Sequence, residues 1–462
     1  MAEITWLRTQ NAALEKRVEE MSVLLAKALK NSATSSKPPS SDIVKPPKKP
    51  PGTSSKGKRK KGGQRGHPRN VRDAFSPEEV AAINNYVLDA CPDCGGAVSL
   101  LPDKKKRVIQ QAEAIPKQIH VEEHRSGAYR CSVCGQIHYA PMPTSVERGG
   151  LIGPVLTAQI AYMKGALHAS FTTIRKYVRD VMGLTISRGQ LSKIVQKVSE
   201  ALEGPYSELI LLLRSEDIVN IDETGHKDNG DRFWTWCFRA NRYTAFKVSN
   251  TRSSQVLFDV LGEEFSGTIG CDFFSAYRKY MRICDARVQF CLAHFIREIK
   301  FLTTLPDPAT VRYGERLLEK MRELFGVIHQ HDALPEALFA QQLSQARSAI
   351  LNESQREVPE AKHAQLVARR LREYGDSYFR FISTPGLEPT NNIAEQAIRF
   401  VAIDRHITQG TRSQKGRQWS ERIWTVMATC TLQGRSAYEY LVAVVNAHFN
   451  GLPPPTLLFD TS

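Results

Sequence analysis

The chain has 462 residues, of which 41% are hydrophobic and 24% charged, so it is long enough for several globular domains, each with its own core. Its formal net charge is +15, and residues 31–72 supply a net of +11 through twelve Lys or Arg and one acid. A polyanion is the expected partner of that segment, and nucleic acid fits better than a membrane because no apolar face accompanies the charge.

The distribution of apolar residues predicts neither a signal peptide nor a transmembrane helix. The N-terminus is acidic and polar rather than basic and then apolar, and no run of about 18 apolar residues occurs. Nine cysteines do not suggest a disulfide scaffold in a chain of this length, and four of them pair at metal-ligand spacing. We therefore expect a cytoplasmic protein in a reducing compartment.

Residues 4–29 are predicted to form a helix with a heptad seam. The seam residues are separated alternately by four and three positions: Leu7, Asn11, Leu14, Val18, Met21, Leu25 and Ala28. A single Asn at one core position can fix the register of a two-stranded coil. Residues 1–30 are then a coiled coil that makes the chain a homodimer, or else an amphipathic helix packed on the body of the same chain. The polar sequence that follows favours the coiled coil.

Residues 31–72 are rich in Ser, Pro, Lys and Gly, as in SKPPSSD and KGKRKKGGQRGH. Such a composition cannot bury enough apolar surface to fold, so the segment is predicted to be disordered alone. It is a solvated linker, an arm that contacts DNA phosphates without reading sequence, or both. The candidate phosphate contacts are Lys58, Arg59, Lys60, Lys61 and Arg65.

Residues 73–150 contain two CxxC pairs, Cys91 with Cys94 and Cys131 with Cys134, and each pair is followed by Gly. Four thiolates bind one Zn²⁺ tetrahedrally, and such a structural site replaces the core that a small segment lacks. We therefore predict a zinc ribbon, with a strand at 108–124 between the pairs. A redox pair is the alternative interpretation.

Residues 151–205 are predicted to be helical, with helices at 151–167, 171–182 and 187–202. The last two of these helices are joined by a short turn that contains Gly, which is the pattern of a helix-turn-helix. This pattern would make the region a DNA-binding one. Arg188 and Lys193 open its second helix and are candidate DNA contacts. A plain helical hairpin without DNA contacts is the alternative.

Residues 206–306 are predicted to begin an α/β core. After a first strand within DIVNIDET, which stops at Asp222 and Glu223, strands are expected at 233–238, 243–248, 268–273 and 287–290. Helices are expected at 254–265 and 293–302. This order fits the ribonuclease-H-like fold, a mixed sheet with helices on both faces, in which the first and fourth strands are neighbours. The fourth strand ends in a further acid, Asp272.

Residues 307–385 are predicted to be a helical insertion, and residues 386–462 complete the core with helices at about 390–406, 417–432 and 436–449. The first of these follows Pro389, has Asn391 or Asn392 as N-cap, and carries Glu395 in its first turns. Carboxylates from two strand ends and one helix can converge on a pair of divalent cations, which act in phosphodiester chemistry. For each acid alone, a strand or helix end with a polar turn is the simpler interpretation.

Basic residues follow the helix of Glu395. They are Arg399, Arg405, Arg412, Lys415 and Arg417. They form either a solvated face or a DNA contact beside the acids, and Arg399 is the first candidate for that contact.

DIVNIDET, GCDFFSAY and NNIAEQAIR resemble the three signature blocks of DDE transposases. With SKPPSSD, GGQRGH and the zinc ribbon, nearly the whole chain is similar to transposases of the bacterial insertion sequence sixty-six family. The resemblance implies that Asp222, Asp272 and Glu395, 50 and 123 residues apart, bind Mg²⁺ or Mn²⁺. It also implies cleavage and joining of DNA strands at terminal inverted repeats and target. A DNA-binding regulator with structural acids, and a nuclease of the same fold, are the alternatives.

The roles of two further residues are left open by the sequence. Cys291 and His294 resemble a CxxH element that follows the second Asp in several such transposases, and they either orient DNA or pack the wall of the site as a buried pair. Glu223 is expected to be a turn or supporting residue rather than a metal ligand.

Overall fold

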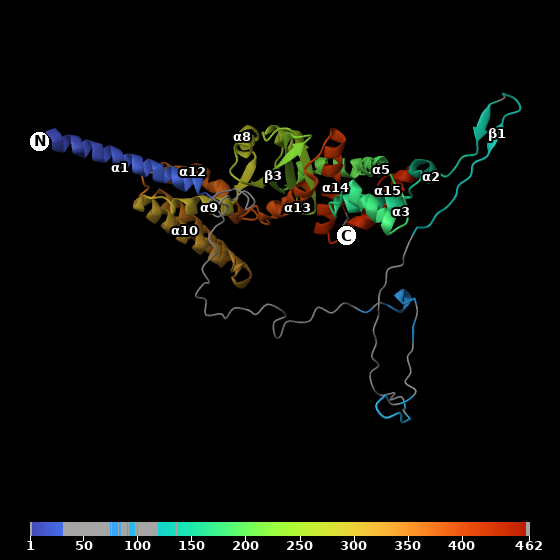
Figure 1. Ribbon diagram of the computed structural model, residues 1–462. Coiled ribbons are helices and arrows are strands. Elements are labelled where there is room, and N and C mark those ends of the chain that lie inside the picture. Colours follow the sequence, from blue (N-terminus) through green and yellow to red (C-terminus); the bar gives the residue numbers. More distant parts are fainter. Residues whose placement is uncertain are drawn as a thin grey trace. The chain divides into compact units, whose positions relative to one another are not determined.

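The computed structural model describes residues 2–30, 119–134 and 136–458, together with short pieces between 74 and 99 (Figure 1). The chain divides into two units, Lys48–His120 and the remainder. In Lys48–His120 the described backbone holds a 3₁₀ helix, Pro77–Glu79, and one antiparallel bridge between Ala90 and Ala97. Among the described residues no helix is both long and apolar enough to cross a bilayer.

A five-stranded mixed sheet in the order β5-β4-β3-β6-β7 lies in the larger unit (Figure 1). Its strands are β3 (Ile218–Asp228), β4 (Asp231–Arg239), β5 (Thr244–Ser249), β6 (Thr268–Cys271) and β7 (Arg287–Phe290). The first three pair antiparallel, whereas β6 runs parallel to both β3 and β7. The five apolar runs predicted to be strands therefore share one sheet, and the first and fourth are neighbours as expected.

Strand β3 continues past the two acids at which its end was predicted. Its parallel pairing with β6 ends at Asn220, but its antiparallel pairing with β4 continues to Asp228. Asn229 and Gly230, with φ of 52° and 95°, form the two-residue turn between these strands. Polar residues stay extended there because β4 supplies their backbone partners. The predicted strand end at Asp222 was therefore wrong.

Helix α14 (Gln414–Leu432) covers the free edge of β5. Three backbone N–H groups of β5 donate to side chains of α14: Thr244 to Thr429 (3.2 Å), Phe246 to Thr425 (3.1 Å) and Val248 to Glu421 (2.7 Å). The acceptors are four residues apart on the helix and the donors two residues apart on the strand. These two separations span nearly the same distance, so each donor lies opposite an acceptor. The edge is thereby closed to pairing with another chain.

Four more helices lie near the sheet: α7 (Gln255–Leu261), α8 (Ser275–Cys284), α9 (Leu292–Leu302) and α13 (Asn392–Thr408). Helix α13 packs against β3 and β4 (Figure 1). Helix α8 was not predicted, although its buried residues Ala276, Tyr277 and Tyr280 have helical spacing. Three residues separate it from β6, and none of them is Gly or Pro.

The helical region before the sheet shares its core with the sheet. Its helices are α2 (Thr144–Gly149), α3 (Pro154–Gly165), α4 (Phe171–Asp180), α5 (Arg188–Ala201) and α6 (Glu203–Leu212). The three predicted helices are α3, α4 and α5. A small cluster with Ile160, Ile174 and Leu191 joins them, whereas Ala158 and Val195 belong to the main core that includes the strands.

The stretch predicted to be a helical insertion holds three helices, α10 (Pro308–Ile328), α11 (Glu336–Gln355) and α12 (Lys362–Tyr378). Helix α12 packs against β7 and α9, so the three helices adjoin the side of the sheet that β7 forms. After α13 and α14, the last helix is α15 (Ala437–Asn450), which packs against α3.

Helix α1 (Ala2–Ala28) forms where a heptad helix was predicted. Leu7, Leu14 and Met21, which lie on the seam, are 54–63% exposed. Only the last part of the helix meets the main core, through Ala26, and Lys30 follows with its Nζ 3.7 Å from the ring centre of Phe301. The described chain therefore leaves the seam uncovered.

The second CxxC pair lies in a small hairpin. Strands β1 (Ala128–Arg130) and β2 (Ile137–Tyr139) pair antiparallel around it. The predicted strand at 108–124 is absent from its described part, residues 119–124, and residues 108–118 lie outside the described chain. The strands instead flank the cysteines, because the turn that presents the thiols also joins the strands; in it Cys131 N–H donates to the carbonyl of Gln136 (2.8 Å).

Candidate active site

Two carboxylates lie on neighbouring strands at one edge of their parallel pairing. Asp222 is on β3, two residues after its last pair with β6, and Asp272 directly follows β6. The Oδ1 atom of Asp222 accepts from the N–H of Glu223 (2.9 Å), and that of Asp272 accepts from the N–H of Phe274 (2.9 Å). Since parallel strands end at the same side of a sheet, their order brings the two acids together.

The third acid, Glu395, is brought to β3 by Asn391. This residue is 2% exposed; its Nδ2 donates to the carbonyl of Ile221 (2.7 Å), and its Oδ1 accepts from Nδ2 of Asn220 (3.0 Å). Asn391 lies at the predicted N-cap position of α13, but its side chain does not cap the helix, because β3 occupies its polar atoms. The start of α13 is thus fixed beside Asp222, and Glu395 follows within the first turn.

The charges of Asp272 and Glu395 act on Asp222. The pKa of Asp222 is raised well above its ordinary value by burial, and further by the charges of Glu223, Asp272 and Glu395. Burial and then the charge of Glu223 raise the pKa of Asp272 to about 7. In the described part of the chain no Lys or Arg forms an ion pair with Asp222 or Asp272. The charge of Arg252 lowers the pKa of Asp272 in part, but neither half-buried carboxylate has a cation of the described chain in contact with it, so both are suited to bind divalent metal ions.

Glu223 has its own cation, unlike the other acids. It is buried within β3, where its Oε1 accepts from Nε and Nη2 of Arg252 (2.8 and 2.5 Å) and its Oε2 accepts from the hydroxyl of Tyr277. The Arg252 guanidinium also lies over the rings of Trp234 and Phe274. Glu223 therefore lies in a strand, paired with Arg252 and Tyr277, and is not part of a turn.

Sequence reasoning missed the partners of these acids. Arg252 lies in the loop after β5, 29 residues from Glu223, and no motif connects them. Tyr277 lies on α8, the helix that was not predicted. The position of Asn391 before the helix of Glu395 was a signal in the sequence, but it predicted a helix cap rather than a contact with β3.

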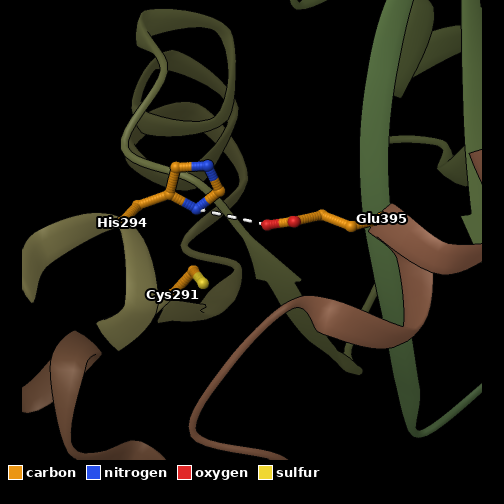
Figure 2. Close-up of side chains that lie close together, drawn as sticks. All are labelled: Cys291, His294 and Glu395. Carbon is orange, nitrogen blue, oxygen red and sulfur yellow. Dashed lines mark ion pairs between the residues drawn. The ribbon is translucent and has the colours of Figure 1, made fainter. Parts of the chain in front are cut away.

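Cys291 and His294 lie against Glu395 (Figure 2). Cys291 is the N-cap residue of α9, and His294 follows in its first turn. The His294 Nδ1 atom is 3.6 Å from Oε1 of Glu395. Burial, and then the charge of Arg297, lowers the pKa of His294 to about 4, so its ring is neutral at pH 7. A cavity of about 130 Å³ adjoins this cluster and is lined by Asp272, Cys291 and His294 among others.

The basic residues fall into three groups. Arg188 and Lys193 of α5 and Arg399 of α13 are exposed, and Arg399 is one turn beyond Glu395. Within the expected cluster Arg405 donates to Thr224 and Arg417 pairs with Asp228, so these two hold β3 rather than face solvent together. The arm residues lie outside the described chain: Lys58, Arg59, Lys60, Lys61 and Arg65.

The predicted zinc ligands are described in part. Cys94, Cys131 and Cys134 are free thiols, and Cys91 lies outside the described residues. The N–H of Cys134 donates to Sγ of Cys131 (3.5 Å), and backbone hydrogen bonds from Cys134 and Val133 lower the pKa of Cys131. A turn that directs N–H groups at a sulfur stabilises the thiolate that a metal requires.

Comparison with known families gives three matches along the chain. Residues 149–418, more than half of it, match the family described as "Transposase IS66 family". Residues 89–135, which enclose all four predicted zinc ligands, match the "zinc-finger binding domain of transposase IS66", and residues 1–73 match a family of unknown function. The chain is also 23% identical over 399 residues to "Uncharacterized protein y4hP" of Sinorhizobium fredii. The matched region covers 77% of this chain and 70% of that protein.

Proposed function

Since the chain belongs to the transposase IS66 family, we propose that it binds the ends of its element and cleaves and joins DNA strands at one two-metal site. The proposed ligands are Asp222, Asp272 and Glu395. The observation that carries the proposal is that Asp222 and Asp272 lie on neighbouring parallel strands at one side of the sheet, and that Asn391 attaches the start of the helix of Glu395 to β3.

The donor set suits hard divalent ions. All three side chains offer carboxylate oxygen, which Mg²⁺ and Mn²⁺ prefer, and burial raises the pKa of Asp222 and of Asp272, so a bound cation would stabilise their charged forms. Two such ions would activate water or a DNA 3′-hydroxyl as nucleophile and stabilise the leaving oxygen. No covalent protein intermediate is needed for this chemistry.

The chain's own residues would hold this arrangement rigid. Asn391 fixes the helix of Glu395 to β3, and Arg252 neutralises Glu223 so that it does not compete as a ligand. Arg399, exposed one turn beyond Glu395, would contact a DNA phosphate. The mixed sheet with β3 between β4 and β6 supports a ribonuclease-H-like fold as the frame of the site.

The remaining regions would bind DNA and a second subunit. Arg188 and Lys193 on the exposed part of α5 would contact DNA as in a helix-turn-helix, and the basic arm would add contacts to phosphates. Cys91, Cys94, Cys131 and Cys134 would hold a structural Zn²⁺. The exposed seam of α1 would pair in a coiled-coil homodimer.

The test is Asp222→Asn in the full chain. We expect it to abolish Mg²⁺-dependent cleavage of a labelled duplex carrying the element's terminal repeats, while binding of that duplex in an electrophoretic shift assay is retained. Asp231→Asn, at the exposed start of β4, is the matched control and should cleave normally. Retained cleavage by the Asp222 variant would contradict the site. Cleavage by the unchanged chain without strand transfer would identify a nuclease, and binding without cleavage a regulator.

A further inference from the structure

A second cluster of ligand types lies beside the three acids. Cys291 and His294 come from the start of α9 and Glu395 from the start of α13, and one ligand atom of each lies within 4.8 Å of the other two. Figure 2 shows His294 and Glu395 pointing toward each other, with Cys291 beside them. Nothing in the proposed cleavage chemistry uses the sulfur or the imidazole.

Two atoms of this cluster are buried without a hydrogen-bond partner in the described chain, Nδ1 of His294 and Oε1 of Glu395. Their separation of 3.6 Å is too long for a hydrogen bond between them. Leaving a buried polar atom unsatisfied costs about 1–3 kcal/mol, and more for a charged group. A cation bound by both atoms removes this cost.

The sulfur of Cys291 is buried at the start of α9 and accepts a backbone hydrogen bond. It is 2% exposed and accepts from the backbone N–H of Asn391 (3.2 Å). Burial raises the pKa of this thiol, while the backbone N–H groups of Asn391, His294 and Ala293 lower it in part, so a bound cation would be what holds the thiolate. N–H groups directed at sulfur, together with a helix N-terminus, stabilise negative charge there.

The spacing and the donor types select the kind of metal. Nitrogen and oxygen ligands about 2.1 Å from a tetrahedral Zn²⁺ are separated by about 3.4 Å, close to the distance between His294 and Glu395. Thiolate and imidazole favour Zn²⁺ and related transition metals over Mg²⁺. Three protein ligands leave one position open.

We propose that Cys291, His294 and Glu395 bind one transition metal ion, Zn²⁺ or a related divalent ion, distinct from the ions at the aspartates and from the zinc ribbon. Its open position adjoins the 130 Å³ cavity that Asp272 also lines, where water or a phosphate oxygen can enter. Glu395 thereby connects this ion with the acid cluster through its second oxygen. The connection to catalysis rests on the proposed function, but binding of the metal does not.

The test counts metal in the full-length protein. The chain is loaded with Zn²⁺, freed of excess metal by gel filtration and analysed by plasma mass spectrometry. We expect two Zn²⁺ per chain, one in the ribbon and one in this cluster. His294→Gln and Cys291→Ser should each contain one, as should Cys94→Ser, which removes the ribbon ion instead. Cys284→Ser, a thiol on α8 outside the cluster, is the matched control and should retain two.

Replacing Zn²⁺ with Co²⁺ identifies which site remains. The ribbon holds several thiolates and this cluster one, so Co²⁺-loaded Cys94→Ser should show weaker sulfur-to-metal absorption than His294→Gln. Equal metal content in the unchanged chain and His294→Gln, with circular dichroism showing both folded, would overturn the proposal. Asp222→Asn should retain both Zn²⁺ ions while losing cleavage, so failure of the metal site and failure of the proposed function give different results.

Discussion

Asp272 is a carboxyl group whose charge opposes folding until a cation compensates it. Burial and the charge of Glu223 raise its pKa to about 7, above the value of about 4 in an unfolded chain. Between these values the folded chain holds a proton that the unfolded chain has released, so stability falls as pH rises from about 4 to about 7. Below about pH 4 the carboxyl is protonated in both the folded and the unfolded chain, so it does not affect stability. Above about pH 7 it is charged in both, and the full loss of stability from the buried charge is present.

Asp272→Asn should therefore stabilise the metal-free protein. At pH 8 with chelator we expect the Tm to rise by about 2–5 °C, and the gain should disappear near pH 4, where the native carboxyl is neutral. Scanning fluorimetry across pH measures this. Asp231→Asn, an exposed acid, should show no such pH-dependent gain. A lower Tm for the Asp272 variant at pH 8 would mean that a cation of the chain already compensates the charge.

At the scale of elements, the attachment of α13 to β3 depends on one amide. Asn391→Ala would leave the Ile221 carbonyl and the Asn220 amide unsatisfied. Asn220 cannot readily move toward β6, because its side chain already lies against Gly270, where a Cβ would be 2.3 Å from its Nδ2.

We expect Asn391→Ala to lower the free energy of unfolding by about 2–4 kcal/mol, since two buried polar groups lose their partner. DNA cleavage should fall more steeply than stability alone explains, because Glu395 is no longer held. Urea unfolding and cleavage rates measure the two effects. Asn392→Ala changes the exposed neighbour and should cost less than about 0.5 kcal/mol. Equal effects of the two variants would show that the amide does not hold the helix.

The elements differ in how far the sequence predicted them. The predicted bounds of β7 agree with the observed ones at both ends, and those of α13 agree within two residues. Alternating or helical apolar patterns specify the buried face of these elements. The extension of β3 was missed because its polar residues are held by β4, a long-range partner that local pattern does not contain. Three acids could be singled out by motif. Arg252 and Tyr277, which neutralise and orient Glu223, come from a loop and an unpredicted helix, so only the fold brings them there.

At the scale of the whole molecule, the positive charge and the acidic site belong to different regions. Residues 31–72 carry +11 of the formal +15, so the rest of the chain is close to neutral. If the arm binds DNA, that binding would depend on counterion release and weaken with salt, whereas chemistry at the proposed acids would not. A dimer would place two arms and two acidic sites on one DNA molecule, which is useful to an enzyme that joins two element ends.

We expect the seam of α1 to form such a dimer. Leu14 is 59% exposed on a helix whose seam nothing in the described chain covers, so a second copy is the partner we expect. Leu14→Glu places like charges opposite each other in such a pair and should convert a species of twice the 51.9 kDa chain mass into a single chain. Light scattering after gel filtration measures the mass. Ala13→Glu adds the same charge outside the seam and should remain dimeric. If both variants keep the doubled mass, the subunits associate elsewhere; if the unchanged chain has the mass of one, α1 does not pair.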